Sequence, residues 1–178
     1  SDYARATGDK EALDYSIRLF ETIEEHSLDK EHNGYREACT RDWKVIEDMR
    51  LSDKDQNYPK SQNTHLHIIE PYTNLYRIWK DTRLERALRN LIDIFTDKIL
   101  NPETHHLDLF FEDNWTRGGG ALESYGHDIE CSWLLHEAAL VLGDPTVLAK
   151  VEPIVRKVAK ASEKGLLSDG SMVHEANV

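Results

Sequence analysis

The segment YGHDIECSW contains the residue types that point most directly to chemistry. If a helix begins near Tyr125, His127 and Glu130 share one of its faces, and Trp133 lies nearby on the following turn. An imidazole moves protons near neutral pH, a carboxylate can orient it or bind a hydroxyl group, and an indole offers an apolar face to a sugar ring. The same spacing also fits a buried histidine–glutamate hydrogen bond beside a core tryptophan, so it leaves both interpretations open.

A second segment, NTHLHIIEPY, places polar residues at the start of another apolar helix. Asn63 and His67 are four residues apart and share a face, whereas His65 points elsewhere. If both helices insert in the same direction around a ring, His67 and His127 reach the same opening. We therefore treat these two histidines as the catalytic candidates, and we expect His65 to be structural.

Histidines also bind metals, so a cation site has to be considered. On a helix His65 and His67 diverge by roughly 160°, so they cannot chelate one ion together. His127 and Glu130 could do so only with ligands from other helices. We expect no metal and no cofactor.

The remaining motifs are weaker. Gly118-Gly119-Gly120 is not a phosphate-binding loop, because no strand precedes it and no lysine follows in register. We interpret it as a mobile turn that carries Trp115 and Arg117 toward the opening. His105 and His106 fall in a predicted loop, where we expect them to face solvent.

Amphipathic helices alternate with the two apolar helices that carry the motifs. Apolar residues recur every three or four positions, which predicts helices with one buried stripe. The predicted amphipathic helices cover residues 11–26, 83–99 and 146–162, and the predicted apolar helices cover residues 64–79 and 126–142. Each amphipathic helix is followed by a short stretch of alternating apolar and polar residues, which suggests a small β-hairpin.

This alternation predicts stacked helical hairpins, with amphipathic helices outside and apolar helices inside. Such hairpins usually close into a toroid, but two inner helices cannot close one. We therefore predict an all-α fold in which residues 1–178 form a single partial domain, an arc of a helical toroid with short β-hairpin loops.

Composition excludes several classes of partner. The 178 residues carry a net charge of −11, which disfavours nucleic acid and anionic membranes. The sequence contains no apolar run long enough to span a bilayer. Its two cysteines fit a reducing compartment, so we expect a cytoplasmic protein.

At these motifs the chain resembles the N-acylglucosamine 2-epimerase superfamily, particularly its cellobiose 2-epimerases. The segments RDWKVIEDMRLSDKD, NTHLHIIEPYTNLYRIW and YGHDIECSWLLHEAA carry the resemblance, which runs through essentially the whole chain. It implies an (α/α)6 barrel about twice the length of this chain. We therefore expect the chain to be the central portion of a longer enzyme.

The resemblance also implies a reaction, the epimerisation of a reducing sugar at C2 through an enediolate, with no cofactor. The substrate would be a cellobiose-type disaccharide or an N-acylglucosamine. His127 matches one of two acid/base histidines of the family, and Glu130 and Trp133 match residues that contact the substrate. Asn63 and His67 match groups that bind sugar oxygens and assist ring opening.

In the resemblance, the second acid/base histidine lies beyond Val178, so we expect this chain alone to be inactive. An open arc should also expose apolar surface at its edges, around Leu75 and around Leu134 and Leu135. Exposed patches of this kind favour self-association.

Other functions remain open at this stage. An aldose–ketose isomerase of the same family would use His67 and His127 but return the proton at C1. A glycoside hydrolase on the same toroid would need two carboxylates, for which Glu70 and Glu130 are the candidates. A helical-repeat binding module would need no catalytic residues.

Overall fold

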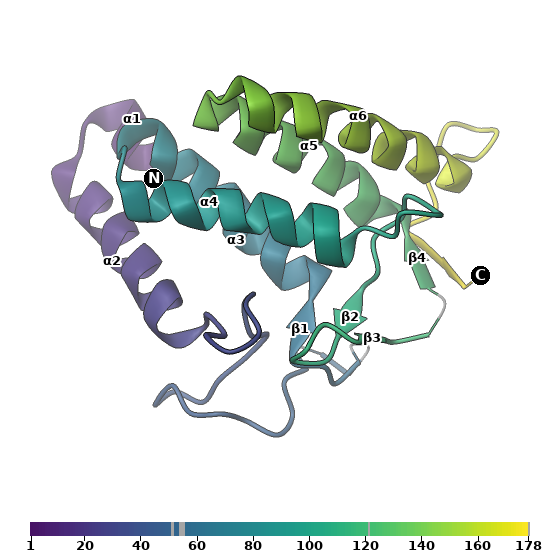
Figure 1. The fold of residues 1–178 in the computed structure, drawn as a ribbon, viewed down its shortest axis with the longest axis horizontal. Helices are drawn as coiled ribbons and strands as arrows, with labels where there is room; N and C mark the ends of the chain where they lie inside the picture. The colour runs from purple at the N-terminus through teal and green to yellow at the C-terminus, as the bar shows by residue number, and fades with distance from the viewer. Residues whose placement is uncertain (51, 54–55, 121, 178) are drawn as a thin grey trace.

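The computed structural model describes residues 1–50, 52–53, 56–120 and 122–177, and most of these residues are helical (Figure 1). The α-helices are α1 (Asp2–Thr7), α2 (Lys10–His26), α3 (Gln62–Ile78), α4 (Thr82–Ile94), α5 (Tyr125–Leu142) and α6 (Pro145–Ser162). The strands are β1 (Lys60–Ser61), β2 (Phe110–Phe111), β3 (Arg117–Gly118), β4 (Leu122–Ser124) and β5 (Glu175–Asn177). A π-helical turn, Phe95–Ile99, follows α4, and a 3-10 turn, Glu163–Gly165, follows α6. The five helices predicted from apolar periodicity are confirmed. We call α2, α4 and α6 the outer helices, and α3 and α5 the inner helices.

Each outer helix begins at an aspartate. The side chains of Asp9, Asp81 and Asp144 accept hydrogen bonds from backbone amides in the first turns of α2, α4 and α6. In α6, Pro145 takes the first helical position, where its missing amide hydrogen is not needed. The repeated pattern of a turn, an aspartate and an amphipathic helix is therefore a repeated N-cap. Helix α6 continues through Pro153 to its end at Ser162.

The core lies where the inner helices meet the outer ones. Helix α5 packs against α3, α4 and α6, and Figure 1 shows α6 running alongside it. The best-buried apolar side chains of these helices, each at most 2% exposed, include Leu66, Ile69, Leu84, Leu88, Leu91, Leu135 and Ala138. Each square ångström of apolar surface removed from water contributes about 25 cal/mol to folding. None of the described helices is long and apolar enough to cross a membrane.

The predicted hairpins after the outer helices are present as tight antiparallel turns. Isolated bridges join Leu28 to Tyr35, Leu100 to Leu107 and Leu166 to Met172. Each bridge lies a few residues after the end of an outer helix, so the three repeats share this feature as well.

Two of these hairpins are attached to the inner helices in the same way. The backbone amide of Tyr35 donates to Nε2 of His65 at 3.0 Å. The backbone amide of Leu107 donates to Oδ1 of Asp128 at 2.9 Å. His65 and Asp128 are each the fourth residue of their helix and are each completely buried. The first turn of each inner helix is thus fixed by the preceding hairpin.

Short strands lead into both inner helices. Strand β1 precedes α3 and pairs with β2, which pairs in turn with β3, and β4 precedes α5 and pairs with β5. All pairs are antiparallel. Figure 1 shows these strands gathered at one end of the helices. The N-terminal ends of α3 and α5 therefore lie at the same end of the molecule.

A buried ion pair joins three distant segments just before α3. The Lys60 ammonium is completely buried, lies 2.7 Å from Oδ2 of Asp29 and also donates to the backbone carbonyl of Asp113. Burial opposes ionisation of Asp29, but Lys60 and the amides of Glu31 and His32 outweigh it and lower the pKa of Asp29 to about 2. The pair holds the first hairpin against the start of α3.

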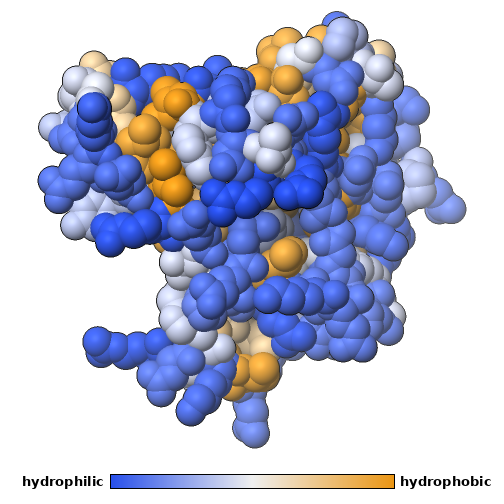
Figure 2. All heavy atoms as spheres, turned by 60° about the vertical axis from the view of Figure 1, so that its left-hand side comes forward, coloured by the Kyte–Doolittle hydropathy of each residue, from blue (hydrophilic) through white to orange (hydrophobic). Residues whose placement is uncertain are grey.

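One prediction about the surface is wrong. Leu75, Leu134 and Leu135 are at most 3% exposed, because they pack into the core between the helices. The large apolar residues that α5 does expose are Ile129, Trp133 and Leu140, at 41%, 51% and 53%. Helix α5 is therefore not enclosed on every side, although its sequence is apolar almost all round. Tyr15 and Leu19 of α2 are also exposed. Figure 2, in which the side of the molecule with α1 and α2 is turned forward, shows patches of hydrophobic residues among hydrophilic ones.

The exposed side of α5 leads us to predict that the 178-residue chain associates with itself. Replacing the exposed Leu140 with lysine should shift the mass of the chain in solution toward that of the monomer. The reason is that association would bury the lysine charge in an apolar contact, which is unfavourable. Light scattering across a concentration series measures this. A strictly monomeric parent chain at every concentration would contradict the prediction.

Candidate active site

His127 lies in the first turn of α5, where the chain passes from β4 into the helix. Its Nδ1 is 2.8 Å from Oγ of Ser124, a residue that does not use its side chain to cap the helix. This contact fixes the ring and leaves Nε2 for a second partner. The imidazole is partly buried, so it combines a held position with access from one side.

The surroundings of His127 contain both signs of charge. Burial lowers its pKa below the ordinary value, Glu130 and Glu175 act in the opposite direction, and the imidazoles of His174 and His67 lower it further. His67 is thus close enough to His127 to influence its protonation. A neutral imidazole, which can accept a proton, is the form that these surroundings favour overall.

The first two turns of α3 carry Asn63 and His67. Asn63 is partly buried and His67 is exposed. The first turn is fixed by Ser61, whose Oγ accepts from the amide of Thr64 at 3.0 Å and donates to the carboxylate of Glu37. The hydroxyl of Thr64 also donates to Glu37, at 2.7 Å. Asn63 and His67 therefore stand on a rigid start of the helix.

His65 is structural, as expected. It is completely buried; its Nδ1 lies 2.7 Å from the carbonyl of Ser61, and its Nε2 accepts from the amide of Tyr35. This pattern requires the neutral ring with its hydrogen on Nδ1. Burial lowers the pKa of His65 from 6.5 to about 4, which keeps the ring neutral.

Trp133 lies at a different place from the histidines. Its indole is half exposed and lines a groove of about 260 Å³ between α5 and α6, together with Val155 and Arg156. Glu130, by contrast, is partly buried and acts on His127 electrostatically. The structure thus brings Asn63, His67, His127 and Glu130 to neighbouring helix starts, and Trp133 lies further along α5 than His127.

A prediction about the hairpin between α4 and α5 is wrong. Trp115 does not reach the opening, because its indole donates to the carbonyl of His32 at 2.9 Å and packs on His65 with ring centres 5.3 Å apart. Arg117 pairs with Asp108 at 2.7 Å. Trp115 therefore supports the fold rather than the site.

His106 does not face solvent either, since it is 2% exposed. Its Nδ1 is 2.6 Å from Oδ2 of Asp128, and its Nε2 is 3.3 Å from Oε1 of Glu123. Burial raises the pKa of Asp128, while hydrogen bonds from His106 and Leu107 act against that rise. This cluster fixes the start of α5, where His127 precedes Asp128.

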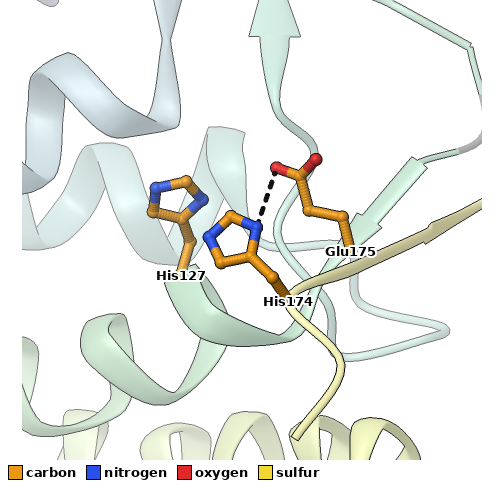
Figure 3. A group of neighbouring side chains, drawn as sticks. All are labelled: His127, His174 and Glu175. Atoms are coloured by element: carbon orange, nitrogen blue, oxygen red, sulfur yellow. Dashed lines mark ion pairs between the residues drawn. The ribbon is translucent and has the colours of Figure 1, made fainter.

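His174 and Glu175 are the residues near His127 that sequence reasoning missed (Figure 3). The rings of His127 and His174 are 5.6 Å apart at an angle of 69°, and Nδ1 of His174 is 3.5 Å from Oε1 of Glu175. The pairing of β4 with β5, which sets Ser124 opposite Glu175, puts them there. The signal available in the sequence was the third hairpin, whose alternating residues end in HEAN.

These three side chains are the described residues whose arrangement could hold a metal ion. One ligand atom from each of His127, His174 and Glu175 lies within 4.8 Å of the others. Elsewhere, a cavity of about 1000 Å³ lies between α2 and α4 and is lined by residues such as Glu24, Tyr35 and Arg83 rather than by the predicted site residues.

Comparison with known protein families identifies the family of the chain. A family model described as N-acylglucosamine 2-epimerase (GlcNAc 2-epimerase) matches residues 1–173. The chain belongs to this family. The predicted membership in the N-acylglucosamine 2-epimerase family is therefore confirmed.

Relatives within the family are named cellobiose 2-epimerases. The chain is 60% identical to the one from Bacteroides fragilis over 178 residues, which is 100% of this chain and 45% of that protein. It is 37% identical to one from Ruminococcus albus, covering 98% of this chain and 44% of that protein. The chain thus spans a little under half the length of these relatives.

Solved structures agree with the fold. The structure of cellobiose 2-epimerase from Bacillus thermoamylovorans matches with a TM-score of 0.89 and 39% identity, covering 98% of this chain and 45% of that one. A crystal structure of D-mannose isomerase matches with a TM-score of 0.74 at 17% identity, which shows a shared fold. The chain is thus an arc of the (α/α)6 barrel of these epimerases, as predicted.

The buried state of His65 predicts how stability responds to acid. Its pKa is about 4 in the fold and 6.5 ordinarily, so the neutral ring is favoured by folding. The contribution, about 3 kcal/mol, is complete above about pH 6.5 and is lost as the pH falls through about 4. Denaturant unfolding of the parent and of His65→Gln between these pH values tests this. The parent should lose more free energy of unfolding than the variant, and equal losses would contradict the prediction.

Proposed function

We propose that this chain belongs to an enzyme that epimerises a reducing sugar at C2, and that His127 is one of its proton-transfer groups. The observation that carries the proposal is the placement of His127, held by Ser124 beside Glu130 and within electrostatic reach of His67. The relatives named cellobiose 2-epimerases support a cellobiose-type disaccharide as the substrate, with an N-acylglucosamine as the alternative.

The proposed reaction begins with the open-chain sugar, whose C2 hydrogen is acidic because the neighbouring carbonyl can delocalise charge. His127 takes that proton and forms the imidazolium, while the C2 electrons move toward the carbonyl oxygen to give an enediolate. A donor on the opposite face then protonates C2 and inverts it. Asn63 and His67 stabilise the developing negative charge on oxygen as hydrogen-bond donors. Glu130 stabilises the imidazolium of His127 or binds a sugar hydroxyl.

Inversion sets a distance that the described residues have to meet. Each reacting nitrogen needs to approach C2 to about 3–3.5 Å, so the two nitrogens stand roughly 6–7 Å apart with the carbon between them. His174 offers a ring nitrogen within 4.8 Å of one on His127, and both rings lie at the same helix start. In this arrangement these two nitrogens are closer together than inversion requires. We therefore propose that the opposite-face group does not come from the described residues.

Trp133 keeps a separate place in the proposal. Its exposed indole suits stacking on a sugar ring. A disaccharide has a second ring that could occupy this position.

Replacing His127 with asparagine should lower C2 exchange by about 10²–10⁴-fold, because a positioned acid/base is lost while the residue remains polar. The measurement is uptake of solvent deuterium at C2 in a chain extended to the full length of its relatives. His105→Asn is a matched control, since His105 lies in a loop with φ of 64°, a conformation that asparagine tolerates. Turnover of His127→Asn near that of the parent would show that His127 is structural.

The 178-residue chain alone should show no measurable epimerisation of cellobiose, mannose or N-acetylglucosamine, since one proton-transfer group is missing. Product analysis by chromatography separates epimer from ketose, and so also distinguishes an aldose–ketose isomerase. Robust epimerisation by a strict monomer would contradict the two-face account.

A further inference from the structure

The three side chains that could bind a metal ion, His127, His174 and Glu175, come from two segments that the fold holds together. His127 belongs to α5, whereas His174 and Glu175 belong to the hairpin that follows α6. Strand pairing sets Ser124 opposite Glu175, and the amide of Gly126 donates to the carbonyl of His174 at 3.4 Å. The cluster is therefore a result of tertiary structure rather than of neighbouring residues in the sequence.

Gly126 makes the close approach possible. A Cβ atom at this position would lie 3.0 Å from Cδ2 and 3.3 Å from Nε2 of His174. These distances are tighter than most real contacts, so any larger residue would press the imidazole away from the start of α5. The absent side chain leaves room for His174 beside His127.

The donor set has a definite chemical preference. Two imidazole nitrogens and one carboxylate oxygen suit zinc and similar divalent transition cations, whereas magnesium and calcium prefer oxygen ligands. Nitrogen ligands stand about 2.0–2.1 Å from zinc, so ligand atoms around one ion are about 3.4 Å apart. The three atoms are now within 4.8 Å of one another. The side chains of His174 and Glu175 are 68% and 40% exposed, so rotation about their side-chain bonds can close the difference.

We propose that His127, His174 and Glu175 form a reversible binding site for a divalent cation of the zinc type, and that the bound cation inhibits the enzyme. The inhibition rests on the proposed function, whereas the binding does not. A cation on His127 occupies the nitrogen lone pair that would accept the C2 proton. Three protein ligands also leave a coordination position for water or a sugar oxygen.

Binding can be measured on the 178-residue chain itself, prepared without a histidine tag. Titration calorimetry with zinc chloride should show about one ion per chain, and magnesium chloride should show none. His174→Ala should weaken zinc binding by about tenfold or more, and Glu175→Gln should weaken it as well. Circular dichroism confirms that each variant is folded.

His32→Ala is the matched control. The Nδ1 of His32 lies 3.7 Å from Asp29 and its Nε2 lies 3.9 Å from Glu31, so this imidazole has carboxylates nearby but no second histidine among its described ion-pair partners. Zinc binding should be unchanged in this variant. The proposal is overturned if the parent chain does not bind zinc, or if His174→Ala and Glu175→Gln bind it as tightly as the parent.

Inhibition is measured as C2 exchange in the chain extended to the length of its relatives. Zinc should abolish exchange in the parent, and a chelator should restore it. His174→Ala, compared with its own exchange in the absence of metal, should lose the sensitivity to zinc. Equal inhibition of parent and variant would place the cation elsewhere and overturn the proposal. If the extended chain shows no exchange even without metal, the proposed function fails, and calorimetry alone then decides the cation site.

Discussion

A hydrogen bond from a hairpin amide to a buried side chain in the first turn of an inner helix is the contact on which the site depends. It occurs twice, from Tyr35 to His65 and from Leu107 to Asp128. Both acceptors are completely buried, so losing either would leave an amide without a partner in the core. The two repeats use different side chains, an imidazole and a carboxylate, to meet the same requirement.

Each buried acceptor stands next to a candidate for the chemistry. Asp128 follows His127 directly, and His65 is two residues before His67. Because neighbouring residues on a helix point in different directions, one side chain can anchor the turn while the other faces the opening. The ring of His106 and the carboxylate of Glu123 continue the support behind Asp128. The site is thus rigid on its protein side and open on the other.

Sequence reasoning succeeded where local pattern decides the structure. Apolar periodicity and aspartate caps located the helices, and the phase of each helix placed His67 and His127 at neighbouring starts. It failed where long-range pairing decides. Nothing local shows that Trp115 packs on His65, or that strand pairing returns His174 to His127. The roles of Asn63, Glu130 and Trp133 toward a sugar remain predictions.

The ion pair between Asp29 and Lys60 has a consequence for how this fold can change in evolution. It closes the base of the segment between residues 29 and 60, so the two ends stay together whatever the chain between them does. Doubling the length of a flexible loop raises its closure free energy by only about 0.6 kcal/mol. Insertions and deletions can therefore accumulate after Glu37, which still binds Ser61 and Thr64, without displacing the start of α3. The two charges themselves can be replaced only together.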